Sequence, residues 1–286
     1  MKRSVVVTGA STGIGYAIAQ MLAREGFHVF AGVRRRQDAD RLIEEIGDEL
    51  TPLVFDIADP EGLAEAARDV GERLGRTTLA GLVNNAGIAT AGPLLHQPIE
   101  EFRRQLEINV VAQVAVVQAF APLLGADRTR TGDPGRIINM SSVAGRIAAP
   151  FLGAYAASKH ALEAVSDSLR RELMLYGVDV IVIEPGSVAT PIWDKAESAD
   201  YTPYFRTDYK DSVSRLRAHA LKEGRAGFPP ERVAASVLRA LVAPKPPTRI
   251  PVVPGRLKNW LLPRLLPDRA LDALIAKGLG LRRPER

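Results

Sequence analysis

Short β-branched apolar runs alternate with helix-like segments along nearly the whole chain, and this alternation restricts the possible folds sharply. The helix-like segments carry apolar residues three and four positions apart, as Ile14, Ile18, Met21 and Leu22 do. Strands that are each followed by a helix pair in parallel, with helices covering both faces of the sheet. We therefore predict an α/β fold built on a doubly wound parallel sheet, of the Rossmann type.

Seven strands and at least five helices follow from this pattern. The strands are expected within residues 3–9, 27–34, 50–57, 79–87, 135–142, 178–186 and 248–253. The helices are expected within residues 13–25, 38–46, 59–75, 99–124 and 154–176. No shift in composition marks a boundary, so residues 1–286 are expected to form a single dinucleotide-binding catalytic domain.

Two segments depart from the alternation. Residues 187–228 read as irregular and aromatic-rich, and they follow the carboxyl end of the sixth strand. Ligands of open α/β sheets bind at that edge, so this segment is expected to be a substrate lid. Residues 253–286 form a basic, apolar C-terminal extension. We expect it to pack on the protein, with contact to an anionic membrane surface as the alternative.

Composition excludes several kinds of site. The chain has no cysteine and four histidines, none of them at metal-ligand spacing from another, so no metal site is expected. The formal net charge of +5 is modest, and no basic patch interleaved with aromatics predicts nucleic-acid binding. The N-terminal apolar run is too short for a signal peptide, and no run of eighteen apolar residues occurs. A cytoplasmic location is expected.

A glycine-rich turn, TGASTGIG, joins the first strand to the first helix. Gly9 would permit the tight turn, Gly13 would let a pyrophosphate approach the backbone, and Gly15 would let helix and strand pack closely. The alternative is an ordinary strand-to-helix turn. Because the turn opens the first βαβ unit, we predict a dinucleotide site there, with Ser11, Thr12 and Ile14 as further contacts.

The end of the second strand bears on which nicotinamide cofactor binds. An acid about twenty residues after the glycines is typical of NAD sites, whereas an arginine there accommodates the 2′-phosphate of NADP. Val33 stands at the position where an NAD site would have the acid, and Arg34 follows it, in the run AGVRRRQD. We predict NADP, with NAD still possible because Asp38 could serve a ribose. A solvated turn is the alternative role for the arginines.

Tyr155 and Lys159 lie four residues apart near the start of a predicted helix, and therefore on one face. Transfer of a hydride between a nicotinamide and a carbon–oxygen group needs a proton donor or acceptor at the oxygen. A nearby ammonium should lower the phenol pKa from its ordinary value near ~10. The pair thus predicts a general acid/base with a cation beside it, provided that neither is merely a surface group.

Six features follow one another along the chain: TGASTGIG, NNAG at 84–87, Asn109, Ser142 in INMSS, YAASK and EPGSVATP. In this order they resemble the short-chain dehydrogenase/reductase family, over about residues 3–252. The local sequence is most similar to that of retinol and 17β-hydroxysteroid dehydrogenases. The resemblance implies that Tyr155 is the acid/base and that Lys159 tunes it and holds the nicotinamide ribose. It also implies that Ser142, rather than Ser141, polarises the substrate oxygen. Asn109 would anchor a relay water, unless it is a tolerated surface residue.

The resemblance implies further cofactor contacts around the carboxyl edge of the sheet. Asp56 would meet the adenine, although a strand-end cap is the alternative, and Thr190 would bond the carboxamide or the pyrophosphate. The remaining contacts that we predict are Ile57, Asn85, Ala86, Gly87, Pro185, Gly186 and Val188.

The uncharged run AAPFL before Tyr155 predicts an apolar substrate. We expect a steroid-like, retinoid-like or aromatic alcohol or ketone to contact Val143, Phe151 and Trp193 together with Ser142 and Tyr155. Homodimers or homotetramers are expected, because family members commonly pair the helices predicted at 99–124 and 154–176. The alternative functions are a non-catalytic NADP sensor and a membrane-surface scaffold.

Overall fold

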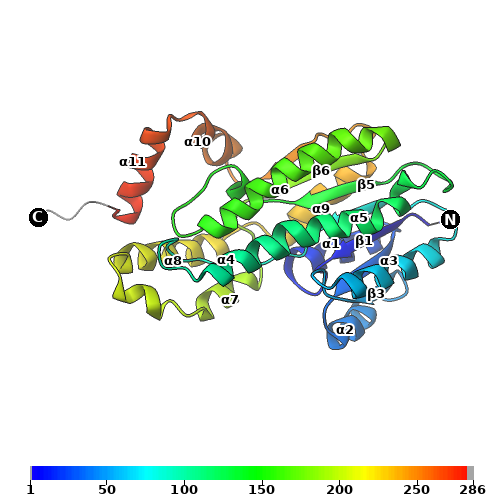
Figure 1. Ribbon diagram of the computed structural model, residues 1–286, viewed down its shortest axis with the longest axis horizontal. Coiled ribbons are helices and arrows are strands. Elements are labelled where there is room, and N and C mark those ends of the chain that lie inside the picture. Colours follow the sequence, from blue (N-terminus) through cyan, green and yellow to red (C-terminus); the bar gives the residue numbers. More distant parts are fainter. Residues whose placement is uncertain (1, 282–286) are drawn as a thin grey trace, which may run out of the picture.

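The computed structural model describes residues 2–281, apart from the side chains of residues 258 and 259. A seven-stranded parallel sheet runs through its centre in the order β3-β2-β1-β4-β5-β6-β7 (Figure 1). The order reverses between β1 and β4, which is the switch point where open α/β sheets bind ligands. The predicted doubly wound sheet is confirmed, including the seventh strand beside β6.

All strands and most helices lie close to their predicted ranges. The strands are β1 Ser4–Thr8, β2 His28–Val33, β3 Leu50–Val54, β4 Gly81–Asn84, β5 Arg136–Met140, β6 Asp179–Pro185 and β7 Arg249–Val252. The helices are α1 Gly13–Arg24, α2 Arg36–Ile46, α3 Pro60–Leu74, α4 Ile99–Leu106, α5 Ala112–Phe120, α6 Gly153–Glu172, α7 Ile192–Ser198, α8 Lys210–Arg225, α9 Pro230–Val242, α10 Leu262–Leu265 and α11 Asp268–Leu279.

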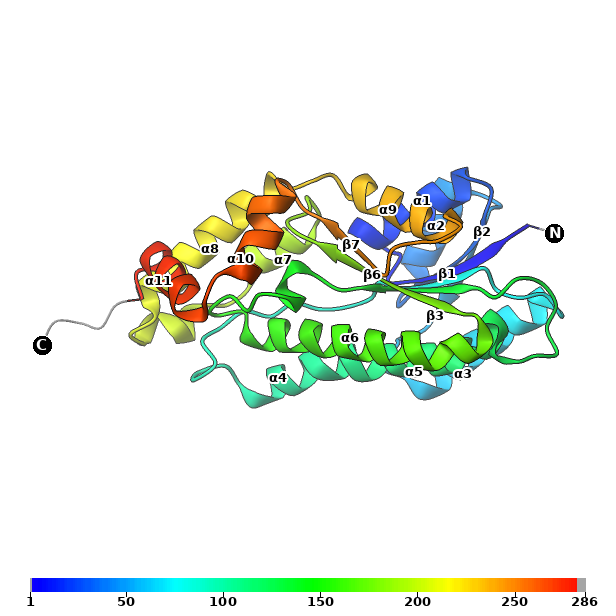
Figure 2. The ribbon, with the colours of Figure 1, turned by 90° about the horizontal axis from the view of Figure 1, so that it is seen from above.

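The sheet separates two apolar cores. Helices α1, α2 and α9 cover one face, and α3, α5 and α6 cover the other (Figure 2). Successive side chains of a strand point to opposite faces, so Val5 and Val7 enter the first core while Val6 enters the second. Both faces are buried, which explains why the strands are apolar without a polar alternation.

Three predicted segments differ in detail from the structure. The helix expected over 99–124 is interrupted by a π-helical turn, Glu107–Val111, between α4 and α5. Residues 187–228 are largely helical rather than irregular, because α8 pairs its few apolar residues, such as Val213, with a small aromatic cluster. The C-terminal extension also folds into short helices, α10 and α11. Within residues 2–281, no helix has the length and apolar character that crossing a membrane would need.

Gly15 marks the closest approach of α1 to the strands. A Cβ atom at this position would lie 2.2 Å from the Gly9 carbonyl oxygen and 2.5 Å from Asn85 Nδ2. Both neighbours belong to the backbone turn or are hydrogen-bonded to it, so neither can yield without moving the turn. The predicted reason for this glycine, close packing of helix on strand, is therefore what the structure shows.

We expect Gly15→Ala to lower the free energy of unfolding by about 1–3 kcal/mol, because the added methyl overpacks a rigid junction. Gly278→Ala is the matched control, since Gly278 lies within α11 and a Cβ there would meet no atom within 4 Å. That control should be neutral or stabilising by up to about 1 kcal/mol. Urea unfolding of both variants measures the difference; equal stabilities would contradict the packing argument.

Candidate active site

The residues after β5 form a tight turn that fixes Ser142. Its side chain begins a short 3₁₀ turn, Val143–Gly145, by accepting a hydrogen bond from the Ala144 amide at 3.1 Å. The Ser142 hydroxyl also donates to the Pro185 carbonyl at the end of β6, at 3.4 Å. Ser142 is therefore held between the carboxyl ends of two neighbouring strands, at the edge where ligands of such sheets bind.

Helix α6 brings Tyr155 and Lys159 to the same place. Lys159 is 7% exposed, and its ammonium donates a hydrogen bond to the carbonyl of Met140, the last residue of β5, at 2.8 Å. Lys159 Nζ lies 5.8 Å from the centre of the Tyr155 ring. Tyr155 in turn is hydrogen-bonded to Ser142. The structure thus brings together the serine, tyrosine and lysine that the sequence predicts.

The pKa values of this pair differ from the expectation. Burial raises the pKa of Tyr155 above its ordinary value, opposed by the hydrogen bond to Ser142. Burial lowers the pKa of Lys159 to about 8, and the carboxylate of Glu163 opposes that effect. Ser142, rather than Lys159, therefore provides the influence that lowers the Tyr155 pKa. Lys159 directs its ammonium at the Met140 carbonyl, whose partial negative charge it meets at short range.

Asn109 is fully buried in the π-helical turn, which excludes the surface alternative. Its Oδ1 accepts from the Ile88 amide and its Nδ2 donates to the Ile88 carbonyl, both at 2.9 Å. The Nδ2 also lies 3.0 Å from Ser158 Oγ, which itself donates to the Tyr155 carbonyl at 2.7 Å. Asn109 therefore supports the first turns of α6, and its service to a relay water stays a prediction.

The glycine turn has the features that a phosphate needs. Gly9 and Gly13 both have positive φ, +66° and +59°. Thr12, at the start of α1, makes no side-chain capping hydrogen bond, and the first turn of α1 holds no acidic residue. The free backbone N–H groups and the helix dipole at the start of α1 therefore suit an anion. Thr190 packs against Gly13, with 3.2 Å between its Cβ and a Cβ built on that glycine, which favours the pyrophosphate side for Thr190.

Residues that the sequence reasoning missed hold this turn in place. The Thr8 hydroxyl accepts hydrogen bonds from the amides of Asn85 and Ala86, at 3.0 and 3.1 Å. Asn85 donates back to the carbonyls of Thr8 and Gly9, and Gln113 donates to the carbonyl of Ala86. Asn85 and Ala86 thus tie β4 to the glycine turn. The available signal was the hydroxyl at the end of an otherwise apolar strand.

The three arginines after β2 differ in their partners. Asp38 accepts two hydrogen bonds from Arg35, at 2.9 and 3.2 Å, and Arg36 pairs with Asp40 at 3.2 Å. Arg34 is exposed and forms no ion pair within the described part of the chain. The Asp38 carboxylate is occupied, which weakens its candidacy as a ribose ligand, and Arg34 is the guanidinium that remains available to an anion.

Arg41 was also missed by the sequence reasoning. It donates to the Ser11 carbonyl in the glycine turn, pairs with Glu45 at 3.1 Å and lies over the Tyr16 ring. It therefore links α2 to the turn that Arg34 flanks. An arginine in the middle of a charged helix gives no sequence signal of such a contact.

The other predicted cofactor residues lie around the same edge. Asp56 is exposed beyond β3 and accepts from the Ala58 amide at 3.0 Å, as the strand-end alternative predicts. Ile57 and Val188 are buried. Gly87 lies between Asn109 and Lys159, because a Cβ built on it would be 3.1 Å from Asn109 Oδ1 and 3.9 Å from Lys159 Nζ. Gly186 pairs with β7 just beyond Pro185.

Two predicted substrate residues are engaged inside the proposed lid. Phe151 has a φ of +65°, which is rare for a bulky residue, and its buried ring stacks edge-on with Tyr209 at 5.6 Å. The Trp193 indole donates to the Val188 carbonyl at 2.7 Å and packs on Gly224 of α8. Both rings therefore stabilise α7 and α8 beside Tyr155. Contact of these rings, or of half-buried Val143, with a substrate stays a prediction.

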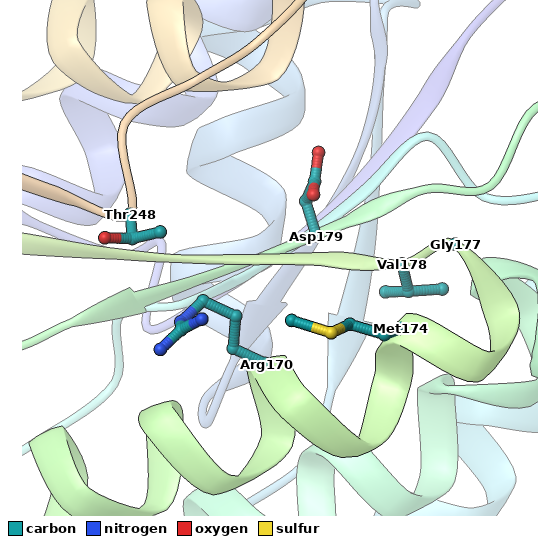
Figure 3. Close-up of a pocket in the computed structure, with 6 residues that line it drawn as sticks. All are labelled: Arg170, Met174, Gly177, Val178, Asp179 and Thr248. Carbon is teal, nitrogen blue, oxygen red and sulfur yellow. The ribbon is translucent and has the colours of Figure 1, made fainter.

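A surface cavity of about 320 Å³ lies at the opposite edge of the sheet (Figure 3). It is lined by Arg170, Met174, Gly177, Val178, Asp179 and Thr248. Asp179 is the first residue of β6, so this cavity is remote from the carboxyl edge and plays no part in the site. Among the described residues, no group of acidic and histidine side chains could hold a metal ion.

The chain is similar to known proteins over nearly its whole length. An NADPH-dependent 3-dehydrocapnine reductase from Ornithobacterium rhinotracheale is 43% identical, over 97% of both chains. Retinol dehydrogenase 5 from Mus musculus is 34% identical, over 95% of this chain and 87% of the relative. The structure is also similar to a short-chain dehydrogenase from Streptomyces avermitilis, with a TM-score of 0.75, 25% identity and 98% and 97% of the two chains covered.

A second solved structure shares the fold at lower identity. It is a short-chain dehydrogenase from Burkholderia cenocepacia J2315 in complex with NADP, with a TM-score of 0.71, 24% identity and 97% and 98% of the two chains covered. The sequence profile described as short chain dehydrogenase matches residues 3–200, which include every candidate catalytic residue. The chain therefore belongs to the short-chain dehydrogenase/reductase family of oxidoreductases.

Proposed function

We propose that this protein is an NADP-dependent oxidoreductase that interconverts a ketone or aldehyde and an alcohol on an apolar substrate. One observation supports the proposal above all others. Ser142, Tyr155 and Lys159 meet at the carboxyl edge of β5, the same edge of the sheet that carries the glycine turn. A reacting oxygen beside Ser142 and Tyr155 would thus face a cofactor whose phosphates lie at α1.

The chain's own residues move a proton while the bound cofactor supplies or accepts the hydride. In the direction of reduction, the Tyr155 hydroxyl donates its proton to the carbonyl oxygen, and the Ser142 hydroxyl polarises that oxygen by a hydrogen bond. The raised pKa of Tyr155 keeps the phenol protonated at neutral pH, which suits an acid. The hydrogen bond with Ser142 stabilises the negative charge left on Tyr155, and Lys159, whose pKa is about 8, would hold the nicotinamide ribose beside it.

The choice of NADP rests on Arg34 and on relatives. A guanidinium with no competing ion pair, next to the last residue of β2, is suited to a 2′-phosphate. The relative from Ornithobacterium rhinotracheale is named as NADPH-dependent, and the Burkholderia cenocepacia structure contains NADP. A non-catalytic NADP sensor is disfavoured, because such a protein has no need of a serine, a half-buried tyrosine and a buried lysine gathered at one edge of the sheet.

The apolar character of the substrate rests on the surroundings of Tyr155. The run before it holds no charged side chain, and the aromatic cluster of Phe151, Tyr204 and Val213 adjoins it. A retinol dehydrogenase and a dehydrocapnine reductase are among the relatives. A panel of retinoid, steroid, aromatic and long-chain ketones and alcohols, followed by nicotinamide absorbance, tests the substrate class. We further propose a cytoplasmic location and a homodimeric or homotetrameric assembly. Light scattering tests the oligomeric state.

Tyr155→Phe should reduce turnover by about 10²- to 10⁴-fold, because the variant lacks the acidic hydroxyl. NADPH binding, measured by fluorescence, should be retained. Tyr176→Phe is the matched control: Tyr176 ends the short helical turn after α6, near the opposite edge of the sheet. Normal turnover by the Tyr155 variant would sink the mechanism.

Arg34→Ala should weaken NADP binding by about tenfold or more, since a charge-assisted hydrogen bond contributes roughly 1.5–3 kcal/mol. NAD binding should change little. Arg36→Ala is the control, because that arginine already pairs with Asp40. Titration calorimetry with both cofactors measures the effect. Tighter binding of NAD than of NADP by the parent protein would overturn the cofactor assignment.

The C-terminal helices support contact with an anionic membrane surface as a second property. Figure 1 shows α10 and α11 standing away from the sheet, and neither helix has a buried residue. Leu265 and Leu274 are 69% and 60% exposed. Arg264, Arg269 and Lys277 stand among these leucines, so the segment combines apolar side chains with the charge that attracts anionic lipid. Residues 282–286 of the predicted extension lie outside the described residues.

We expect the parent protein to sediment with phosphatidylglycerol vesicles and much less with phosphatidylcholine vesicles. Replacing Leu265 and Leu274 together by glutamate should abolish sedimentation without affecting turnover of a soluble substrate. Leu95→Glu, at another exposed leucine far along the chain, is the control. Unchanged sedimentation of the double variant, or a change from dimer to monomer instead, would contradict the membrane assignment.

A further inference from the structure

Two buried carboxylates and two arginines form a compact cluster behind the candidate active site. Glu163 of α6 accepts from Arg146 Nη2 at 2.7 Å and from Arg249 Nε at 3.0 Å. Glu184 of β6 accepts from Arg146 Nε at 2.8 Å and from the Trp260 indole at 2.6 Å. Glu163 and Glu184 are 4% and 0% exposed. Burying such charges is expensive unless ion pairs and hydrogen bonds compensate them.

The cluster touches both parts of the candidate site. Glu163 follows Lys159 by four residues, so the two side chains lie on the same face of α6. Arg146 directly follows the 3₁₀ turn that fixes Ser142. Gly145 is pressed between them, because a Cβ built on it would lie 3.1 Å from the Lys159 carbonyl oxygen and 3.2 Å from Glu163 Cγ. The Arg146–Glu163 pair thus clamps the serine turn onto the helix of Tyr155 and Lys159.

Glu163 is the acidic group that favours the charged form of Lys159. Facing Glu163 are Lys159 from α6, Arg146 from the turn after β5, Ser141 from the end of β5, Glu184 from β6 and Arg249 from β7. Arg249 also pairs with Asp167 of α6, at 2.9 Å. The one hydrogen bond that the Lys159 ammonium makes within the described residues is to the uncharged Met140 carbonyl. Both arginines bond Glu163 Oε2, and Ser141 is a further side-chain hydrogen-bond partner of this carboxylate. The Glu163 carboxylate therefore retains an acceptor oxygen that its arginines do not use.

We propose that Glu163 is a positioning residue of the reaction: its carboxylate clamps the Ser142 turn to α6 and provides the buried negative charge that keeps Lys159 cationic. The proposal rests on the oxidoreductase function of the site and adds a residue to it. The titration behaviour agrees. Burial raises the pKa of Glu163 to about 7, and burial lowers that of Lys159 to about 8, so both groups are charged between those pH values.

The direct test measures the Lys159 pKa by NMR of protein labelled with ¹³C at the lysine Cε atoms, with Lys159→Arg to assign the signal. Glu163→Gln removes the negative charge and keeps the shape, so the Lys159 pKa should fall by about one pH unit. At pH 7.5 that shift would reduce the cationic fraction about threefold. Asp167→Asn is the matched control, one turn farther along α6 at another partner of Arg249, and should leave the titration unchanged. A Lys159 titration that does not move in Glu163→Gln would overturn the proposal.

A further variant guards against a loss of folding in Glu163→Gln. Glu163→Asp keeps the charge and should keep the Lys159 pKa near that of the parent; a fall as large as in Glu163→Gln would contradict the assignment. The NMR titration needs no turnover, so a failure of the proposed activity remains distinct from a failure of this proposal.

The activity profile is the second readout. If the parent turns over NADPH, the alkaline limb of its kcat profile should fall with the Lys159 titration near pH 8. In Glu163→Gln that limb should move to lower pH by the same amount as the NMR titration. A uniform loss of kcat without a shift of the limb would indicate a merely structural role and overturn the proposal.

Discussion

The hydrogen bond from the Lys159 ammonium to the Met140 carbonyl attaches α6, the helix that carries two candidate catalytic residues, to the centre of the sheet. A buried ammonium without such a partner would be strongly destabilising, so α6 must lie against the carboxyl end of β5. Once it does, Tyr155 one turn earlier meets Ser142 two residues beyond β5. Gly87 and Gly145 leave room for this arrangement, because a Cβ atom would press on Asn109 at the first position and on the α6 backbone at the second. The distances within the candidate site therefore follow from one constraint on where a charge can be buried.

The carboxyl half of the sheet is stabilised differently from its centre. The strands pack through Val, Ile and Leu, whereas the loops beyond them are fixed by polar side chains, among them buried Thr8 and Asn109 and half-buried Asn85. These groups hydrogen-bond to backbone that has left the sheet ladder and would otherwise be unpaired. The π-helical turn at Asn109 has the same effect, because it directs the buried Asn109 side chain at both the Ile88 amide and the Ile88 carbonyl.

Sequence reasoning predicted the sheet, and it predicted which serine, tyrosine and lysine lie together at its edge, because both depend on local patterns. The β-branched runs specify strands, and the four-residue spacing of Tyr155 and Lys159 specifies a shared helix face. It missed α8, where a mostly polar helix is stabilised by a distant aromatic cluster around Phe151. It also misjudged the Tyr155 pKa and overlooked Arg41 and Glu163, because desolvation and partners brought from other elements decide those properties.

The C-terminal segment is attached to the body of the protein next to the candidate active site. Trp260 donates to buried Glu184, with Arg256 and Arg264 stacked on its ring at 5.3 and 4.5 Å. The next residue, Pro185, accepts the hydrogen bond of Ser142. The exposed helices α10 and α11 thus connect, through two consecutive residues of β6, to the carboxylate cluster facing Lys159 and to the serine itself. Any surface that binds those helices therefore acts on a segment that contacts β6 directly beside the candidate site.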